Sequence, residues 1–281
     1  MPILELDHVG FSYPNGFCAV KDVCLSVAPG EKIAIIGENG AGKTTTAKLI
    51  NGLLRPSQGE VRIQGKSTAK QTVASIASQA GYVFQNPDDQ IFNKDIYSEI
   101  TYTLRYNKVC PPDEIERRAA DALELVGLAD KSGENPYDLS YSHRKFVTIC
   151  SVVLQDPAMV ILDEPTAGQD LACLKRIGEI VDYLQGKGKA VITITHDMEF
   201  VANHFDRVVV MAHGNIIADG TPREIFWNAD VLKEAALHPP YIGLLARELG
   251  LKGRVLSIDE FIQALEDAGV KPTREGGCVC P

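Results

Sequence analysis

The sequence has no apolar run long enough to cross a membrane. Its longest apolar stretches, Phe146–Leu154 and Met159–Leu162, fall well short of the roughly 20 residues that a bilayer requires. The N-terminal stretch also lacks a basic segment followed by an apolar core, because Glu5 and Asp7 stand there instead. We therefore expect a chain that is neither inserted into a membrane nor secreted, and that stays in the cytosol.

Positive charge is in short supply as well. The 28 Lys and Arg residues are outnumbered by 37 Asp and Glu, which gives a net charge of −9. An acidic surface repels phosphate backbones, so nucleic acid is not an expected partner. The seven cysteines are an odd number without an export signal, and this favours reduced thiols over a disulfide framework. Cys278 and Cys280 could hold a soft metal or belong to an unstructured tail, and two thiolates without further ligands make a poor site.

Continuous apolar runs, by contrast, recur along the chain. Strands that are covered on both faces lose the two-residue alternation of polar and apolar side chains, so these runs predict buried parallel strands. They lie at Lys32–Gly37, Met159–Asp163, Ala190–Thr195 and Val208–Met211. Leu4–Tyr13 and Val20–Val27 alternate more clearly and predict an antiparallel edge sheet, while Gly214-Asn215 predicts a hairpin turn. The fold class is therefore α/β.

Two regions of the sequence lack strand signals. The interval of about 86–156 holds helical patterns such as Pro112–Val126, so we expect a helical subdomain inserted into the α/β core. Residues 226–281 carry short helical pieces and the amphipathic stretch Ile258–Ala268. We expect one large domain at 1–225, followed by a small C-terminal helical extension and tail at 226–281.

The strongest chemical signal is a glycine-rich loop between a predicted strand and the amphipathic stretch Thr45–Leu54. The loop fits the phosphate-binding pattern G-x-x-x-x-G-K-[ST] with Gly37, Glu38, Asn39, Gly40, Ala41, Gly42, Lys43 and Thr44. Glycines let backbone amides and the helix N-terminus face phosphates, while Lys43 reaches the β and γ oxygens. Thr44 offers a hydroxyl to Mg²⁺. A glycine-rich turn with a chance lysine is the alternative.

A second signal ends the predicted strand Met159–Asp163. Asp163 is placed to hold Mg²⁺ through water, and Glu164 can polarise an attacking water as a general base. An apolar run that ends in Asp-Glu is by itself more often structural. Next to a phosphate-binding loop, it predicts hydrolysis of a nucleoside triphosphate with Mg²⁺.

The residues beside these two motifs resemble, in order and spacing, those of an ABC ATPase. Tyr13 matches the aromatic residue that stacks on adenine, and Gln85 matches the glutamine that senses Mg²⁺ and the membrane partner. Asp170 matches the loop that crosses between subunits, and His196 matches the histidine at the γ-phosphate. The resemblance covers residues 3 to about 225. It implies a P-loop NTPase core with an antiparallel β subdomain, ATP contacts from Tyr13 and from Gly37 through Thr45, and catalysis by Glu164 with His196.

Three stretches are further similar to the ATPases of energy-coupling factor (ECF) and cobalt-type importers, namely GENGAGKTTTAKLINGLLRPSQGEV, VFQNPDDQIF and PPYIGLLARELGL. This resemblance implies an importer for a vitamin or a transition-metal ion. It implies two ATPases on the cytoplasmic face of the membrane, bound to a transmembrane coupling protein and a small substrate-binding membrane component. Asp88 and Asp89 would then face basic side chains of the membrane partner.

The chain departs from the family at the signature motif. ABC ATPases carry a sequence close to L-S-G-G-Q, and here Leu139-Ser140-Tyr141-Ser142-His143 stands in its place. Ser140 and Asp170 are expected to act in trans on the partner's ATP, but a tyrosine side chain crowds an approach that glycine permits. A complete set of hydrolytic residues beside an altered signature favours a heterodimer with a second ABC ATPase whose signature is intact.

Two other functions remain open at this point. A subunit that binds nucleotide without hydrolysing it would explain Tyr141 and His143, although Glu164 and His196 are retained. A soluble mechanical ABC ATPase acting on DNA or ribosomes is disfavoured, since the chain has neither a long coiled-coil insertion nor a second cassette and its net charge is acidic.

Overall fold

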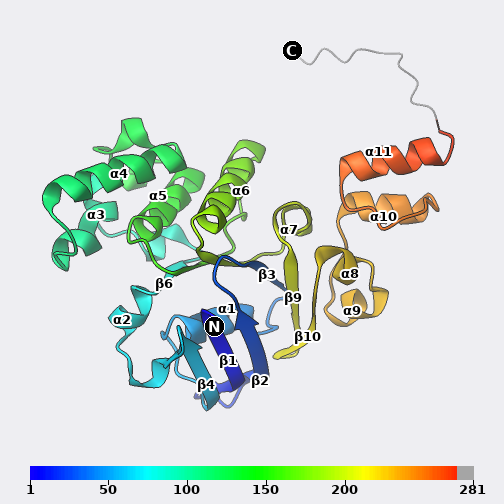
Figure 1. Cartoon of the computed structure of the whole chain (residues 1–281), viewed down its shortest axis with the longest axis horizontal. Helices are drawn as coiled ribbons and strands as arrows, with labels where there is room; N and C mark the ends of the chain where they lie inside the picture. The colour runs from blue at the N-terminus through cyan, green and yellow to red at the C-terminus, as the bar shows by residue number, and fades with distance from the viewer. Residues whose placement is uncertain (271–281) are drawn as a thin grey trace.

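The computed structural model describes residues 1–270 and contains two β-sheets with helices around them (Figure 1). The larger sheet has the strand order β10-β9-β3-β8-β7-β6. Its strands are β3 (Lys32–Ile36), β6 (Ala80–Val83), β7 (Met159–Asp163), β8 (Ala190–Ile194), β9 (Arg207–Ala212) and β10 (Asn215–Gly220). All neighbours in this sheet are parallel except the β9–β10 hairpin. The α/β fold class is thus confirmed.

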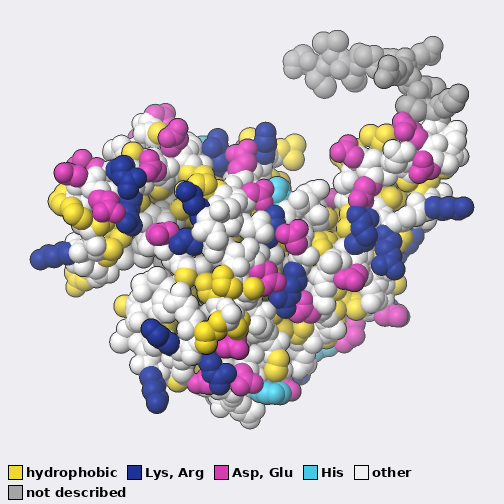
Figure 2. Space-filling view, in the orientation of Figure 1, with side chains coloured by type: hydrophobic (Ala, Val, Ile, Leu, Met, Phe, Trp, Pro, Cys, Tyr) yellow, Lys and Arg dark blue, Asp and Glu magenta, His cyan; other side chains and the backbone are white. Residues whose placement is uncertain are grey.

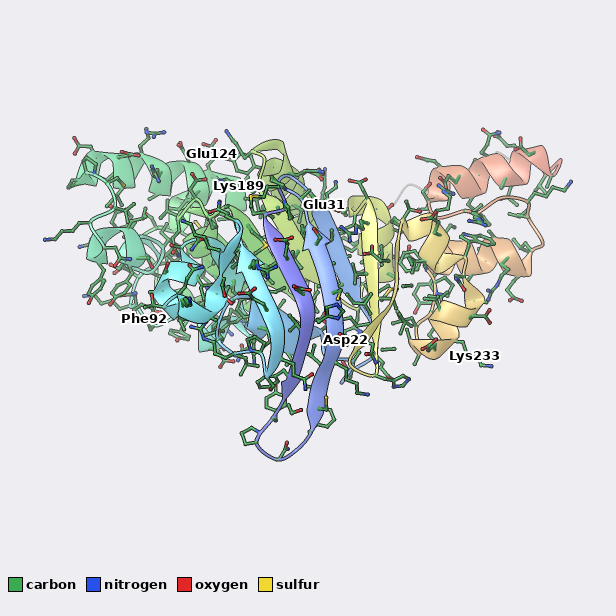
Figure 3. The ribbon with its side chains drawn as sticks, turned by 60° about the horizontal axis from the view of Figure 1, so that its bottom comes forward. Asp22, Glu31, Phe92, Glu124, Lys189 and Lys233 are labelled. Carbon is green, nitrogen blue, oxygen red and sulfur yellow. The ribbon has the colours of Figure 1, made fainter. Side chains whose placement is uncertain are left out.

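The smaller sheet is antiparallel, with the order β2-β1-β4-β5. Its strands are β1 (Leu4–Ser12), β2 (Cys18–Val27), β4 (Gln58–Ile63) and β5 (Lys66–Ser67). The tip of the β1–β2 hairpin projects away from the rest of the molecule (Figure 3). This sheet packs on one face of the larger one and forms the predicted antiparallel subdomain.

The larger sheet is buried on both faces, as its continuous apolar strands predict. Alternate residues of β3 enter different hydrophobic cores: Ile33 and Ile35 pack with the antiparallel sheet, and Ala34 and Ile36 pack on the opposite face. The first core includes helix α1 (Lys43–Ile50) and residues of α2 (Val73–Ala77), and the second includes α6 (Leu171–Gly186) and α7 (Met198–His204).

The helical subdomain lies at one end of the molecule (Figure 1). It contains α3 (Ile96–Tyr106), α4 (Pro112–Val126) and α5 (Tyr141–Val153), with 3₁₀ turns at Pro87–Asp89, Ala129–Lys131 and Pro136–Asp138; a further 3₁₀ turn, Thr68–Lys70, follows β5. Helix α4 starts after Pro111, with Pro112 as its first residue, and ends at Val126, because the next residue, Gly127, adopts a left-handed conformation. Its predicted bounds are therefore confirmed.

Helix α8 (Pro222–Phe226) crosses the predicted boundary after residue 225, and the C-terminal extension beyond it contains α9 (Ala229–Glu234), α10 (Tyr241–Glu248) and α11 (Ile258–Asp267). A small core of Ala246, Val255 and Ala264 joins α10 to α11. Figure 1 shows this pair at the end of the molecule opposite the helical subdomain. Cys278 and Cys280 lie outside the described residues, and no helix within residues 1–270 has the length and hydropathy of a membrane span.

Two predicted boundaries are wrong. Helix α1 runs from Lys43 to Ile50 instead of Thr45–Leu54, because Gly42 takes a left-handed conformation directly before it and Gly52 takes one soon after it ends. The β9–β10 turn is His213-Gly214 instead of Gly214-Asn215. Both residues have positive φ angles, 52° and 83°, as a two-residue hairpin turn of type I′ requires.

The face of the molecule seen in Figure 2 carries Lys and Arg side chains interspersed with Asp and Glu. No extended field of one sign covers it.

Candidate active site

A cavity of about 870 Å³ opens where β3, β7 and β8 end. Ligand sites in open α/β sheets usually lie at this carboxyl edge. Side chains and backbone from distant parts of the sequence line the cavity. They include Asn39, Gly40, Gly42 to Thr45, Gln85, Glu164, Thr166, Ala167, His196 to Glu199, and Ala236 to Tyr241. The fold thus brings together the glycine-rich loop, Gln85, Glu164 and His196, which the sequence placed far apart.

The glycine-rich loop depends on two glycines for its path. Gly37 and Gly42 have φ angles of 151° and 104°, in the region that favours glycine. A Cβ on Gly37 would lie 2.1 Å from the Met211 carbonyl oxygen, and one on Gly42 would lie 2.5 Å from that of Ala19. Gly42 also starts α1 without a side chain that caps the helix. The first amides of α1 are therefore available to an anion.

Lys43 is buried within the loop. Its Nζ donates hydrogen bonds to the carbonyl oxygens of Gly37 at 2.7 Å and Glu38 at 2.9 Å. Burial lowers the pKa of Lys43, while the negative charges of Glu164 and Asp163 oppose that shift. A phosphate that replaces one of these carbonyls as acceptor would give the ammonium a charged partner.

Asp163 ends β7 and is almost completely buried. Its Oδ1 lies 3.4 Å from the Thr44 hydroxyl, and its Oδ2 accepts a 2.7 Å hydrogen bond from the Tyr82 hydroxyl. Burial first, and then the charge of Asp163, raise the pKa of Tyr82. Tyr82 was not among the predicted site residues. Hydroxyl, carboxylate and amide oxygens are suitable Mg²⁺ donors, so Thr44 and Asp163, with Gln85 at the cavity, fit this ion.

Glu164 adopts a φ of 48°, which is unusual for a residue with a side chain. Its amide donates to the Ile194 carbonyl at 2.8 Å, and its Oε1 lies 3.2 Å from Nε2 of His196. Burial raises the pKa of Glu164 to about 7, although Lys43 acts in the opposite direction. Burial and Lys43 lower the pKa of His196. A carboxyl with a pKa near neutrality is suited to accept a proton from water.

Tyr13 lies beside the glycine-rich loop but does not line the cavity. Its hydroxyl is 3.1 Å from that of Thr45, and its ring packs edge-on against Phe11 at 4.9 Å. Phe17, which is 54% exposed, lines the cavity instead. Phe17 was not among the predicted site residues, and its only signal in the sequence is that of an aromatic residue at a hairpin tip.

Ser140 and Asp170 lie outside the cavity, at helix N-termini. The Ser140 hydroxyl caps α5 and lies 2.8 Å from Nδ1 of His143. Asp170 caps α6 by accepting a 2.8 Å hydrogen bond from the Cys173 amide. Their predicted action in trans needs a second subunit, and it stays a prediction.

Asp88 has a partner within the chain, an ion pair with Arg144 at 2.9 Å. If Asp88 contacts basic side chains of a membrane partner, as predicted, those side chains must compete with Arg144 for its carboxylate.

Comparison with known proteins agrees with the resemblance to ABC ATPases. The profile of the ABC transporter family matches residues 20–167. The energy-coupling factor transporter ATP-binding protein EcfA of Methanocaldococcus jannaschii is 35% identical over 91% of this chain and 92% of its own length. A putative ABC transporter ATP-binding protein of Caldanaerobacter subterraneus, TTE1589, is 38% identical over 92% of this chain, which spans only 45% of that relative. The structure of cbiO1 from Clostridium perfringens, described as part of the ABC transporter complex cbiONQ, matches with a TM-score of 0.75 and 32% identity over 88% of this chain and 99% of its own.

Proposed function

Because the chain belongs to the ABC transporter ATP-binding family, we propose that it binds ATP with Mg²⁺ and hydrolyses the ATP to drive an ECF-type importer. The observation that carries this proposal is the convergence of Lys43, Thr44, Glu164 and His196 on one cavity, with Asp163 bonded to Thr44 at its edge. Three relatives that match over most of their length are named energy-coupling factor transporter ATP-binding proteins. The imported solute is proposed to be a vitamin or a transition-metal ion.

In this proposal, the α1 N-terminus and Lys43 bind the β and γ phosphates. Mg²⁺ held by Thr44 and Asp163, with Gln85, would neutralise charge that develops on the phosphates. Glu164 accepts the proton of the attacking water, and His196, with Nε2 3.2 Å from Oε1 of Glu164, orients that carboxylate. We assign His196 the contact with the γ-phosphate as well. An aromatic ring at the hairpin, Tyr13 or Phe17, stacks on adenine.

The proposed partners are a second ABC ATPase, a transmembrane coupling protein and a small substrate-binding membrane component, at the cytoplasmic face of the membrane. The altered signature supports a heterodimer. The Ser140 hydroxyl contacts the His143 imidazole at 2.8 Å and accepts from the His143 amide at 3.3 Å, so a partner's γ-phosphate would compete with contacts inside this chain. The ATP site completed by this signature would be slow, and the site completed by the partner's signature would be fast.

The proposal is tested by measuring ATP hydrolysis of the purified chain alone and together with an ABC ATPase that carries an intact signature. We expect slow turnover alone and fast turnover in the mixture, with Lys43→Met in this chain abolishing the gain. Brisk hydrolysis by the chain alone would show that the altered loop is an active signature.

A second candidate is a subunit that binds nucleotide without hydrolysing it, which the departures at Tyr141 and His143 of the signature motivate. Single-turnover hydrolysis in the mixed dimer, with the partner's own site disabled, separates the two. ATP that stays intact in this chain's site would establish the non-hydrolysing function.

A further inference from the structure

Lys145, in the second turn of α5, is completely removed from solvent. Its Nζ donates hydrogen bonds to the carbonyl oxygens of Phe84, at 2.9 Å, and of Gln85. A buried ammonium is costly unless it is hydrogen-bonded and compensated by opposite charge. Asp163 and Glu164 supply that charge, since both act to keep Lys145 protonated against the effect of burial. The lysine is therefore held at the backbone that leads from β6 into the cavity.

Two further side chains of α5 reach the same segment. The Tyr141 hydroxyl donates to the Gln85 carbonyl at 3.3 Å, and Arg144 pairs with Asp88 at 2.9 Å. Positions 141, 144 and 145 are spaced i, i+3 and i+4, so they share one face of the helix. This face of α5, defined by Tyr141, Arg144 and Lys145, contacts Phe84, Gln85 and Asp88.

We propose that this face of α5 acts within its own chain, with Lys145 as the positioning residue that fixes the backbone of Gln85 and so directs its side chain into the cavity. Tyr141 stands where the signature pattern has glycine, and its hydroxyl adds a second bond to the same carbonyl. The altered signature thus exchanges a contact across the dimer for a contact in cis. The relevance of Gln85 to ATP rests on the proposed function.

The test is hydrogen–deuterium exchange of the nucleotide-free chain, followed by mass spectrometry of peptides that cover residues 84–92. In Lys145→Met, exchange in this segment should rise about tenfold or more, since two hydrogen bonds from a charged donor are lost. Tyr141→Phe should raise it by a smaller factor, and Lys145→Gln, which keeps an N–H donor, should fall between Lys145→Met and the unmodified chain.

Lys189→Met is the matched control. Lys189, labelled in Figure 3, pairs with Asp156 instead, and its loss should leave exchange at 84–92 unchanged. Unaltered exchange in Lys145→Met would overturn the proposal, and so would loosening that spreads equally through α5 and β7, which indicates a general packing role. Should Lys145→Met fail to fold, Lys145→Gln and Tyr141→Phe decide the question by the same readout.

ATP binding gives an independent readout. Without Mg²⁺, Lys145→Met should bind a fluorescent ATP analogue within about twofold of the unmodified chain, because the α1 N-terminus and Lys43 are intact. The Mg²⁺ concentration needed for half-maximal tightening should rise. An unchanged Mg²⁺ requirement would overturn the link between Lys145 and the function of Gln85. If the unmodified chain itself binds no ATP, the proposed function fails, while the exchange experiment still decides whether Lys145 positions Gln85.

Discussion

Replacing Glu164 by glutamine is expected to separate ATP binding from hydrolysis. The amide has nearly the same shape as the carboxyl, so it can occupy the same site 3.2 Å from His196. The backbone N–H of residue 164 keeps its hydrogen bond to the Ile194 carbonyl, and glutamine adopts a φ of 48° no less readily than glutamate. The variant therefore removes a proton acceptor and a negative charge while it preserves the local structure.

The magnitude follows from the role of the side chain. A lost general base typically lowers the rate by about 10²–10⁴-fold, and we expect turnover of Glu164→Gln to fall within that range. Affinity for ATP should be equal or higher, since a buried carboxylate no longer repels the γ-phosphate. The melting temperature should not fall, because a neutral amide costs less to bury than a carboxylate.

The assay combines steady-state phosphate release, equilibrium binding of a fluorescent ATP analogue and thermal unfolding, all on one preparation. Glu179→Gln is the control, because it removes a surface carboxylate paired with Arg176, far from the cavity. Turnover of Glu164→Gln at the unmodified rate would refute the assignment, and His196 would be the next candidate for the base. Equal loss of binding and turnover would show that Glu164 serves to hold ATP instead.

The remaining predictions concern the loop and the adenine contact. Lys43→Met should weaken ATP binding by about a hundredfold or more, because charge-assisted bonds to the phosphates are lost, and titration calorimetry checks this. Gly42→Ala should destabilise the fold by about 1–3 kcal/mol or more, since its Cβ would lie 2.5 Å from the Ala19 carbonyl, and the urea midpoint checks this. Of Tyr13→Ala and Phe17→Ala, the one that removes the stacked ring should weaken ATP by about 1–3 kcal/mol, measured by the same calorimetry. Equal affinity in both variants would mean that neither ring stacks on adenine.

The sequence predicted most of the fold because its central strands are marked by composition. Residues of β7 and β8 are apolar on both faces, and helix α4 carries its own start and stop signals in Pro112 and Gly127. Strand β6 was missed, because four residues that include a glycine give little pattern to detect. This segment, which lies between α2 and the helical subdomain, is held as a strand by its pairing with β7, which is a tertiary effect.

The candidate site was predictable where a motif encodes the chemistry locally, as it does for Lys43 and Asp163. Residues that act through a partner far along the chain could not be predicted from the sequence. Tyr82 bonds Asp163 from another strand, and Lys145 bonds the backbone of Gln85 from a helix 60 residues away. Nothing near these residues in the sequence distinguishes them from ordinary core side chains, because their roles arise only when the sheet and α5 are assembled.

The absence of a side-chain cap on α1 has a thermodynamic consequence. The amides that begin this helix can be satisfied by a bound phosphate group, which the folded chain can hold and the unfolded chain cannot. Folding and nucleotide concentration are therefore linked. At a free ATP concentration a hundred times the dissociation constant, the folded state gains about 2.7 kcal/mol, a substantial share of the stability of an ordinary domain. The same chain should thus resist proteolysis in an energised cell and become a better substrate for proteases when ATP is depleted.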